Sequence, residues 1–151
     1  MIYKYNFSIL GDNFYPEKII DKIQGDFLVE SFFNPTDKIE IDLPDVYGFG
    51  GMYFWHPQKF STGENIMQYE NGFIKFIEEN YLLFIKNEVD DLQIFIEIYF
   101  DGGQCNFEIF NKELLKKLGN FGVSLPISVY LLKKRKIHKW KKEIKLVWES
   151  Y

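Results

Sequence analysis

The chain has no alanine, a single cysteine (Cys105), a single arginine (Arg135) and only two histidines, His56 and His138. One cysteine excludes an internal disulfide framework and any zinc site built from several cysteines. The missing alanine and the richness in lysine, isoleucine, asparagine and phenylalanine are typical of an AT-rich genome and give no functional signal.

Long apolar runs are also missing. The longest, VSLPISVYLL at residues 123–132, is about half as long as a membrane-spanning helix needs to be. The amino-terminal stretch MIYKYNFSILGDNF carries polar residues throughout, so it does not form the apolar centre of a signal peptide. Both absences predict a soluble cytoplasmic protein without membrane association.

What the chain does contain is enough apolar material for one core. Its 151 residues, of which 46% are hydrophobic and 26% are charged, fit a single domain of ordinary size. The formal net charge of −4 is unevenly divided, because residues 1–132 hold 10 Lys+Arg against 20 Asp+Glu, whereas residues 133–151 hold 8 against 2. The sequence therefore predicts an acidic domain at 1–132 and a basic tail at 133–151.

Alternating apolar and polar residues predict the strands. The clearest alternation is IYKYNFSIL at 2–10. Further extended segments are expected at 26–33 (DFLVESFF), 38–43 (KIEIDL), 52–60 (MYFWHPQKF, interrupted by Pro57) and 122–132, the last core strand. The segments 92–100 and 104–110 flank Asp101-Gly102-Gly103, which predicts a β-hairpin.

Helical spacing of apolar residues predicts helices from Pro16 to a stop at Gly25, over 66–85, over 112–118 before Gly119, and in the tail. Gly72 weakens the second helix, so it could begin only near Asn71. In the tail, one apolar seam is formed by Ile137, Trp140, Ile144, Val147 and Tyr151, and a strand through Ile144, Leu146 and Trp148 fits fewer residues.

The order of these elements predicts an α+β fold. We expect a single mixed, mainly antiparallel sheet with helices packed on one face. The basic amphipathic helix at 133–151 is expected to dock on the same domain, where its apolar seam would cover part of the sheet and its lysines would offset part of the negative charge.

Three segments resemble a bacterial family catalogued as domain-of-unknown-function family 4279. They are NFSILGDNFYPEKIIDKI at 6–23, MYFWHP at 52–57, and the block from Leu92 to Tyr130 with its hairpin, Leu-rich helix and final strand. The resemblance covers most of residues 3–132 and leaves the basic tail outside. It implies no catalytic signature, and it implies a link to bacterial immunity genes, whose products protect a cell from a toxin.

The stretch GFGG at 48–51 is not a dinucleotide-binding fingerprint. Gly48 and Gly50 have the spacing of the first two glycines in the Gly-x-Gly-x-x-Gly fingerprint, but Tyr53 occupies the position of the third. A strand-like segment follows instead of a helix. The stretch is therefore predicted to be an entry loop in which glycine allows sharp turns. The alternative is an aromatic-lined groove for a partner.

No cofactor, metal or catalytic residue is predicted. The two histidines are about eighty residues apart, Cys105 lacks a nucleophile signature, and the chain has neither a Gly-x-Ser-x-Gly elbow nor a phosphate-binding loop. An enzyme using His56 as a general base remains a third hypothesis, and it would need a nearby carboxylate.

The first hypothesis is a non-enzymatic protein-binding domain, and its most specific form is an immunity protein that neutralises a cognate toxin. Its candidate contact residues are Asp42, Asp45, Tyr47, Phe49, Tyr53, Trp55, Asp90 and Asp91. The second hypothesis is a nucleic-acid-associated module that uses the basic tail. Its candidate residues are Lys134, Arg135, Lys139, Trp140 and Lys142.

Overall fold

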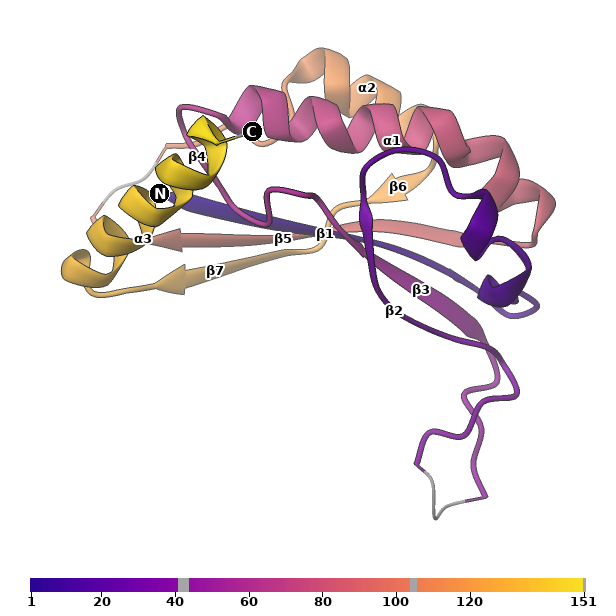
Figure 1. The fold of residues 1–151 in the computed structure, drawn as a ribbon. Coiled ribbons are helices and arrows are strands. Elements are labelled where there is room, and N and C mark those ends of the chain that lie inside the picture. Colours follow the sequence, from indigo (N-terminus) through magenta and orange to yellow (C-terminus); the bar gives the residue numbers. More distant parts are fainter. Residues whose placement is uncertain (41–43, 104–105, 151) are drawn as a thin grey trace.

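The computed structural model describes residues 1–40, 44–103 and 106–150. It confirms the predicted α+β class, with one mixed sheet and three α-helices in the described part of the chain (Figure 1). The strands are β1 Ile2–Gly11, β2 Leu28–Phe33, β3 Gly50–Trp55, β4 Ser61–Thr62, β5 Asp91–Phe100, β6 Val123–Ser124 and β7 Ile127–Leu131. The helices are α1 Ile66–Lys86, α2 Lys112–Asn120 and α3 Lys134–Glu149, and two short 3-10 helices cover Pro16–Lys18 and Ile20–Lys22.

The sheet is built around β1. Its order is β2-β3-β1-β5-β6, with β4 paired to the start of β1 and β7 paired to β5. The pairs β2–β3, β1–β3, β1–β4 and β1–β5 are antiparallel, whereas β6 and β7 run parallel to β5. In this register Asn6 lies directly between Trp55 of β3 and Phe95 of β5.

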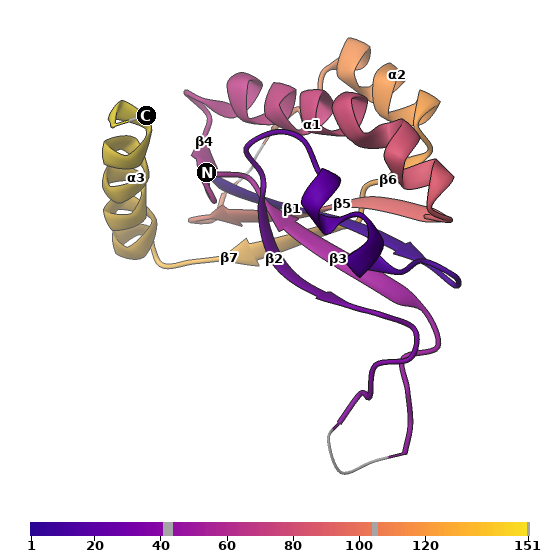
Figure 2. The same ribbon diagram turned by 45° about the vertical axis from the view of Figure 1, so that its right-hand side comes forward.

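Helices α1 and α2 cover one face of the sheet, and the core lies between these layers (Figures 1 and 2). Successive strand residues point to opposite faces, so Tyr5, Phe7 and Ile9 of β1 all face the helices and are buried. They meet the apolar stripe of α1, where Phe76 stacks edge-on against Phe7 at 5.8 Å. The other face of the sheet has no helix across its middle in either view. Only its end at Ile2 and Tyr99 is contacted by a helix, namely α3.

Helix α3 stands at one end of the sheet (Figures 1 and 2). Ile137 and Ile144 are buried and form a small second core with Ile2. Trp148 also turns inward, and its Nε1 donates a hydrogen bond to the Phe60 carbonyl at 3.0 Å. Val147, expected in the apolar seam, is half exposed because the seam runs through Trp148 at that turn, and Tyr151 lies outside the described residues.

The predicted hairpin at 92–110 is wrong. Residues 106–110 form no strand, and β5 pairs with β1, β6 and β7 instead. The competing contact is a buried carboxylate: Glu70 of α1 accepts hydrogen bonds from the Phe110 amide at 2.9 Å and from the Tyr5 hydroxyl at 3.0 Å. These bonds hold the segment before α2 against α1 and away from β5.

Other boundaries also differ from the predictions. Helix α1 begins at Ile66, five residues before Asn71, and the segment from Pro16 forms two 3-10 turns in place of one helix. The predicted last core strand is divided at Pro126, which has no amide hydrogen for a ladder bond but accepts one from the Ile96 amide at 2.8 Å. Its second part, β7, is an edge strand with mostly exposed side chains. Of the edge strand expected at 38–43, only a bridge between Lys38 and Val46 lies within the described residues.

Candidate functional site

The side of the sheet opposite α1 and α2 carries a row of aromatic side chains, and we call it the open face; α3 contacts it only at the Tyr99 end. The register places on it Tyr53 and Trp55 of β3, Phe95 and Tyr99 of β5, and Tyr130 of β7. Between them lie polar residues of β1 and β5, namely Lys4, Asn6, Ser8, Gln93 and Glu97. Most of these side chains are half-buried, because neighbours on the same face pack against one another.

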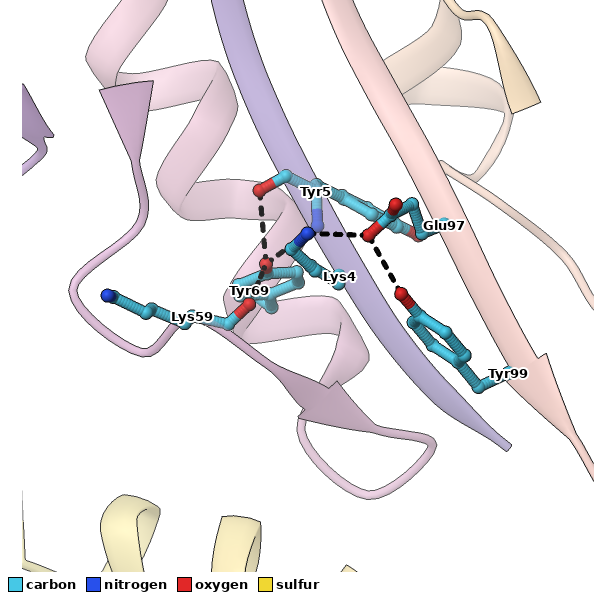
Figure 3. A network of polar contacts seen from close by, with 6 residues as sticks. All are labelled: Lys4, Tyr5, Lys59, Tyr69, Glu97 and Tyr99. Carbon is cyan, nitrogen blue, oxygen red and sulfur yellow. Dashed lines mark hydrogen bonds and ion pairs between the residues drawn. The ribbon is translucent and has the colours of Figure 1, made fainter. Parts of the chain in front are cut away.

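Trp55, the last residue of β3, is held on the open face by two lysine side chains. The Lys4 ammonium lies 4.6 Å from the centroid of its ring, and the Lys59 ammonium lies 5.4 Å from it. Lys4 also forms an ion pair with Glu97 at 2.7 Å, and the Tyr99 hydroxyl donates to the same carboxylate oxygen at 2.9 Å (Figure 3). Burial, together with this carboxylate, raises the pKa of Tyr99.

A second contact in Figure 3 ties the open face to the helical layer. The hydroxyl of Tyr69 on α1 accepts a hydrogen bond from the Tyr5 amide at 2.9 Å and donates one to the Lys59 carbonyl at 3.1 Å. Burial raises the pKa of Tyr69, so this hydroxyl stays neutral and able to donate. The backbone of β1 at Tyr5 and the segment after β3 at Lys59 are therefore both held to α1.

The connection from β2 to β3 projects away from the body (Figures 1 and 2), and we call its described residues, 34–40 and 44–49, the finger. Its base is an aromatic cluster: Phe33 stacks on Tyr47 with ring centroids 3.9 Å apart and meets Phe49 edge-on at 5.4 Å. Tyr53 of the open face lies 6.3 Å from Phe33. The finger and the open face thus form one continuous surface.

The glycines where the finger joins β3 are required by close packing or by backbone conformation. A Cβ atom on Gly50 would lie 1.7 Å from the Phe14 carbonyl oxygen, and one on Gly51 would lie 2.6 Å from the Phe33 ring. Gly48 has a φ of +75°, which favours glycine. In this structure, GFGG is a sharp entry into β3.

The structure brings together only some of the predicted contact residues. Tyr47, Phe49, Tyr53 and Trp55 lie along the finger base and the open face, and Asp45 lies on the finger, where its carbonyl accepts from the Ile39 amide at 3.1 Å. Asp42 lies outside the described residues.

The two acidic candidates at the start of β5 lie apart from the finger. Asp91 pairs with Leu10, which pairs with Gly51 on its other side, so two strand spacings separate Asp91 from the finger base. Asp90 precedes β5 in the connection from α1, where its carboxylate accepts from the Asp12 amide at 3.3 Å. The sequence did not single out Phe33, Phe95 or Tyr99; their alternation with core residues was the available signal.

His56 follows β3 and is buried among aromatic rings. The ring centroids of Tyr69 and Trp148 lie 4.7 Å and 6.1 Å from that of His56. Nδ1 of His56 accepts a hydrogen bond from the backbone amide of Gln58 at 3.0 Å. Burial lowers the pKa of His56 to about 4, so the ring is neutral near pH 7. Among the described residues, no carboxylate accepts a hydrogen bond from it, and no three or more His, Cys, Asp or Glu residues form a metal-binding group.

Packing of His56 against α1 gives a testable prediction. A Cβ atom on Gly72 would lie 2.6 Å from Nε2 of His56. We expect Gly72→Ala to lower the free energy of unfolding by about 1–3 kcal/mol, despite the better helix propensity of alanine. Gly119→Ala in α2, where nothing lies within 4 Å of the added atom, should instead raise it by up to about 1 kcal/mol. Urea denaturation of both variants checks these opposite signs.

The basic candidates all lie on α3. Lys134, Arg135, Lys139 and Lys142 are exposed, and Lys139 is 3.8 Å from Glu143. Trp140 is half-buried and packs edge-on against Tyr99 at 5.6 Å, in addition to its contact with Phe60. No helix in the described ranges is long and apolar enough to cross a membrane.

The comparisons with known proteins gave no match: no family model matches the chain, and no curated protein or solved structure is detectably similar to it. The resemblance to family 4279 therefore stays a prediction.

Proposed function

We propose that the chain is a non-enzymatic, cytoplasmic protein-binding domain that contacts its partner through the open face and the finger. The observation that carries this proposal is the row of aromatic residues on the sheet face opposite α1 and α2, most of which α3 leaves uncovered. Tyrosine and tryptophan supply large contact areas at a low cost in side-chain entropy and dominate the binding energy of interfaces. The hydrogen bonds and ion pairs around Trp55 fix these rings before a partner arrives, which lowers the cost of binding further.

The charge of the molecule supports a basic partner. Residues 1–132 carry twice as many acidic as basic residues, and the described finger contributes Asp37, Glu40 and Asp45 against Lys38. Exposed Ile39 and Val46 lie beside these carboxylates. A complementary basic surface would be drawn to the finger by long-range attraction, which speeds association and rejects acidic proteins.

The most specific form of this proposal is an immunity protein that neutralises a cognate bacterial toxin. A toxin that cleaves nucleic acid has a cationic substrate cleft, and an acidic finger with apolar residues beside its charges is complementary to such a cleft in charge. The resemblance of residues 3–132 to family 4279 supports the same idea, since it implies a link to immunity genes.

The experiment is co-expression with the product of the adjacent gene. We expect protection of the host cell and a stable complex in size-exclusion chromatography. Phe95→Asp on the open face should weaken the complex by about 30-fold or more, the effect of losing one central aromatic contact. Leu82→Asp is the matched control, because Leu82 lies 70% exposed on α1 in the opposite layer, and it should leave binding unchanged.

Folding of both variants is verified by urea denaturation. A folded Phe95→Asp variant that binds as tightly as the unchanged protein would contradict the proposed surface. If the two gene products neither associate nor protect the cell, the immunity function is wrong.

A nucleic-acid-associated function is the second candidate, and one observation favours it. A cleft of about 400 Å³ is lined by His138, Lys141, Lys142 and Lys145 of α3, together with residues at the start of β1 and after β4. Titration of a labelled single-stranded oligonucleotide at low and moderate salt decides this question. Binding with a steep salt dependence that Lys142→Glu reduces would support it, and no binding at low salt would exclude it.

A further inference from the structure

The outer edge of β7 has unpaired backbone groups. Among the described residues, β7 pairs only with β5, and it lies at the border of the sheet (Figure 1). The Pro126 carbonyl and the Leu132 amide, just outside its two ends, both bond to β5 at 2.8 Å. Successive peptide groups of a strand point to opposite sides, so the N–H and C=O groups of Ile127, Val129 and Leu131 point outward. No backbone group of the described residues bonds to them.

The side chains of the same three residues form an exposed apolar row. Ile127 and Val129 pair with buried residues of β5, so this row points to the same side of the sheet as the core. Its members are nevertheless more than half exposed, with Ile127 at 51%, Val129 at 52% and Leu131 at 68%. An apolar row beside unpaired backbone groups is a template for another strand.

The two borders of the sheet differ in how they are protected. Sheet edges are commonly protected by charges, prolines or bulges. Strand β2, at the opposite border, carries Glu30, and its register with β3 shifts between Val29 and Ser31. The five residues of β7 include neither a charged residue nor a proline, and their register with β5 is regular. This difference favours β7 as the border that another strand covers.

Helix α3 leaves the outer edge of β7 accessible. It follows β7 closely in the chain, but its buried residues Ile137 and Ile144 pack with Ile2 of β1, two strands further in. Trp140 likewise packs on Tyr99 of β5. The helix therefore leans toward the middle of the sheet and away from the free edge.

A second copy of β7 fits this edge in antiparallel orientation. If Val129 of one copy lies opposite Val129 of the other, Ile127 of each copy lies opposite Leu131. At all three pairs the N–H and C=O groups point toward the other copy, so each pair can exchange two backbone hydrogen bonds. Opposed side chains share one face, so the two apolar rows cover each other.

The same register keeps the basic tails apart. The strands are antiparallel, so the two tails leave from opposite ends, and Lys133 lies opposite Leu125 of the second copy. Pro126 lies opposite Leu132, where the missing amide hydrogen costs nothing because the peptide groups there point toward β5. No like charges therefore oppose each other along the paired strands.

We propose that the chain forms a two-fold symmetric dimer in which the β7 strands pair about Val129 and join the two sheets into one. The partner is a second copy, because the outward backbone groups and the apolar row are both symmetric about the central residue of β7. Such a surface is complementary to itself. The finger and Phe95 take no part, so the dimer goes beyond the proposed function and does not depend on it.

The first test is sedimentation equilibrium over protein concentrations from about 1 μM to about 1 mM. Because the contact is small, we expect a change from one chain to two with a Kd of about 10–100 μM. Val129→Lys and Val129→Glu each place like charges on the two-fold axis and should weaken the dimer by about 10-fold or more. An equimolar mixture of the two should restore it, because Lys then opposes Glu. Leu82→Lys, at a 70% exposed position on α1, is the matched control and should dimerise normally.

Amide hydrogen exchange tests the same register without a substitution. The amides of Ile127, Val129 and Leu131 should exchange rapidly in dilute protein and slowly at the highest concentration. Those of Ser128 and Tyr130, which point toward β5, should be protected in both.

Three results would overturn the proposal. They are a protein that stays monomeric at the highest concentration, a dimer that persists in both charged variants, and a loss of dimer that the mixture does not reverse. Concentration-independent exchange at Val129 would contradict it as well. Urea denaturation verifies that the variants are folded, and none of these outcomes bears on the complex with a different protein.

Discussion

Replacing Gly50 with alanine is expected to lower the free energy of unfolding by about 3 kcal/mol or more, among the largest effects of any single methyl group in this chain. The added Cβ would lie 1.7 Å from the carbonyl oxygen of Phe14 and 2.7 Å from its carbonyl carbon. Both are backbone atoms, so no side-chain rotation relieves the overlap. Either β3 or the turn after β1 has to move, and Gly50 pairs with Gly11 in the sheet.

Two other glycines give a graded control series. Gly63→Ala meets nothing within 4 Å and has no positive φ, so it should change stability by less than about 0.5 kcal/mol. Gly48→Ala is also free of contacts, but its φ of +75° should cost about 1 kcal/mol through backbone strain. Urea denaturation followed by tryptophan fluorescence measures all three. A loss below 1 kcal/mol for Gly50→Ala would contradict the packing of the 11–14 turn against β3.

Sequence periodicity predicted the elements that keep one face buried along their length. Residues 3–9 alternate without interruption, and they form the middle of β1; the stripe from Ile66 to Ile85 is α1. The sequence left the start of α1 open between Ile66 and Asn71, because glycine has a low helix propensity and Gly72 lies near that end. Gly72 is tolerated within the helix because its missing side chain makes room for His56, a contact that no local pattern contains.

The predicted hairpin is wrong because a contact between distant residues outweighs its local turn signal. Its turn signal at 101–103 is local, whereas the contact that competes with it joins Glu70 to Phe110 across 40 positions of sequence. A buried carboxylate with two donors in place outweighs a favourable turn, because unpairing it would leave an ionisable group alone in the core. Pairing preferences between distant segments are not visible in composition or spacing.

The candidate surface was predictable only in its local part. Tyr47, Phe49, Tyr53 and Trp55 stand out because they cluster near glycines in the sequence. Their neighbours Phe95 and Tyr99 join them only because β1 separates β3 from β5 with a definite register, and strand order is a tertiary property. The side-chain nitrogen of Gln58, which is buried without a hydrogen-bond partner among the described residues, is equally invisible in sequence. Whether this atom finds a partner depends on residues that are distant in the chain.

The buried imidazole of His56 is expected to make stability fall as the medium is acidified. Its pKa is lowered from 6.5 to about 4, with burial as the main cause. Below pH 6.5 the unfolded chain takes up a proton at this position, whereas the folded protein does not until about pH 4, so the free energy of unfolding decreases across this window. The full difference corresponds to about 3 kcal/mol.

Other groups titrate in the same range, so the measurement compares two proteins. Burial raises the pKa of Glu70, and its protonation favours the folded state, which opposes the effect of His56. In His56→Asn, the side-chain oxygen replaces Nδ1 as acceptor for the Gln58 amide but has no proton to gain. The pH dependence of the unfolding free energy, measured from pH 7 to pH 4 for both proteins, should be less steep toward acid in this variant. The ring protons of His56 in an NMR titration give the same pKa directly. A midpoint near 6.5 would show that the ring is hydrated, and the aromatic enclosure by Phe27, Tyr69 and Trp148 would then be wrong.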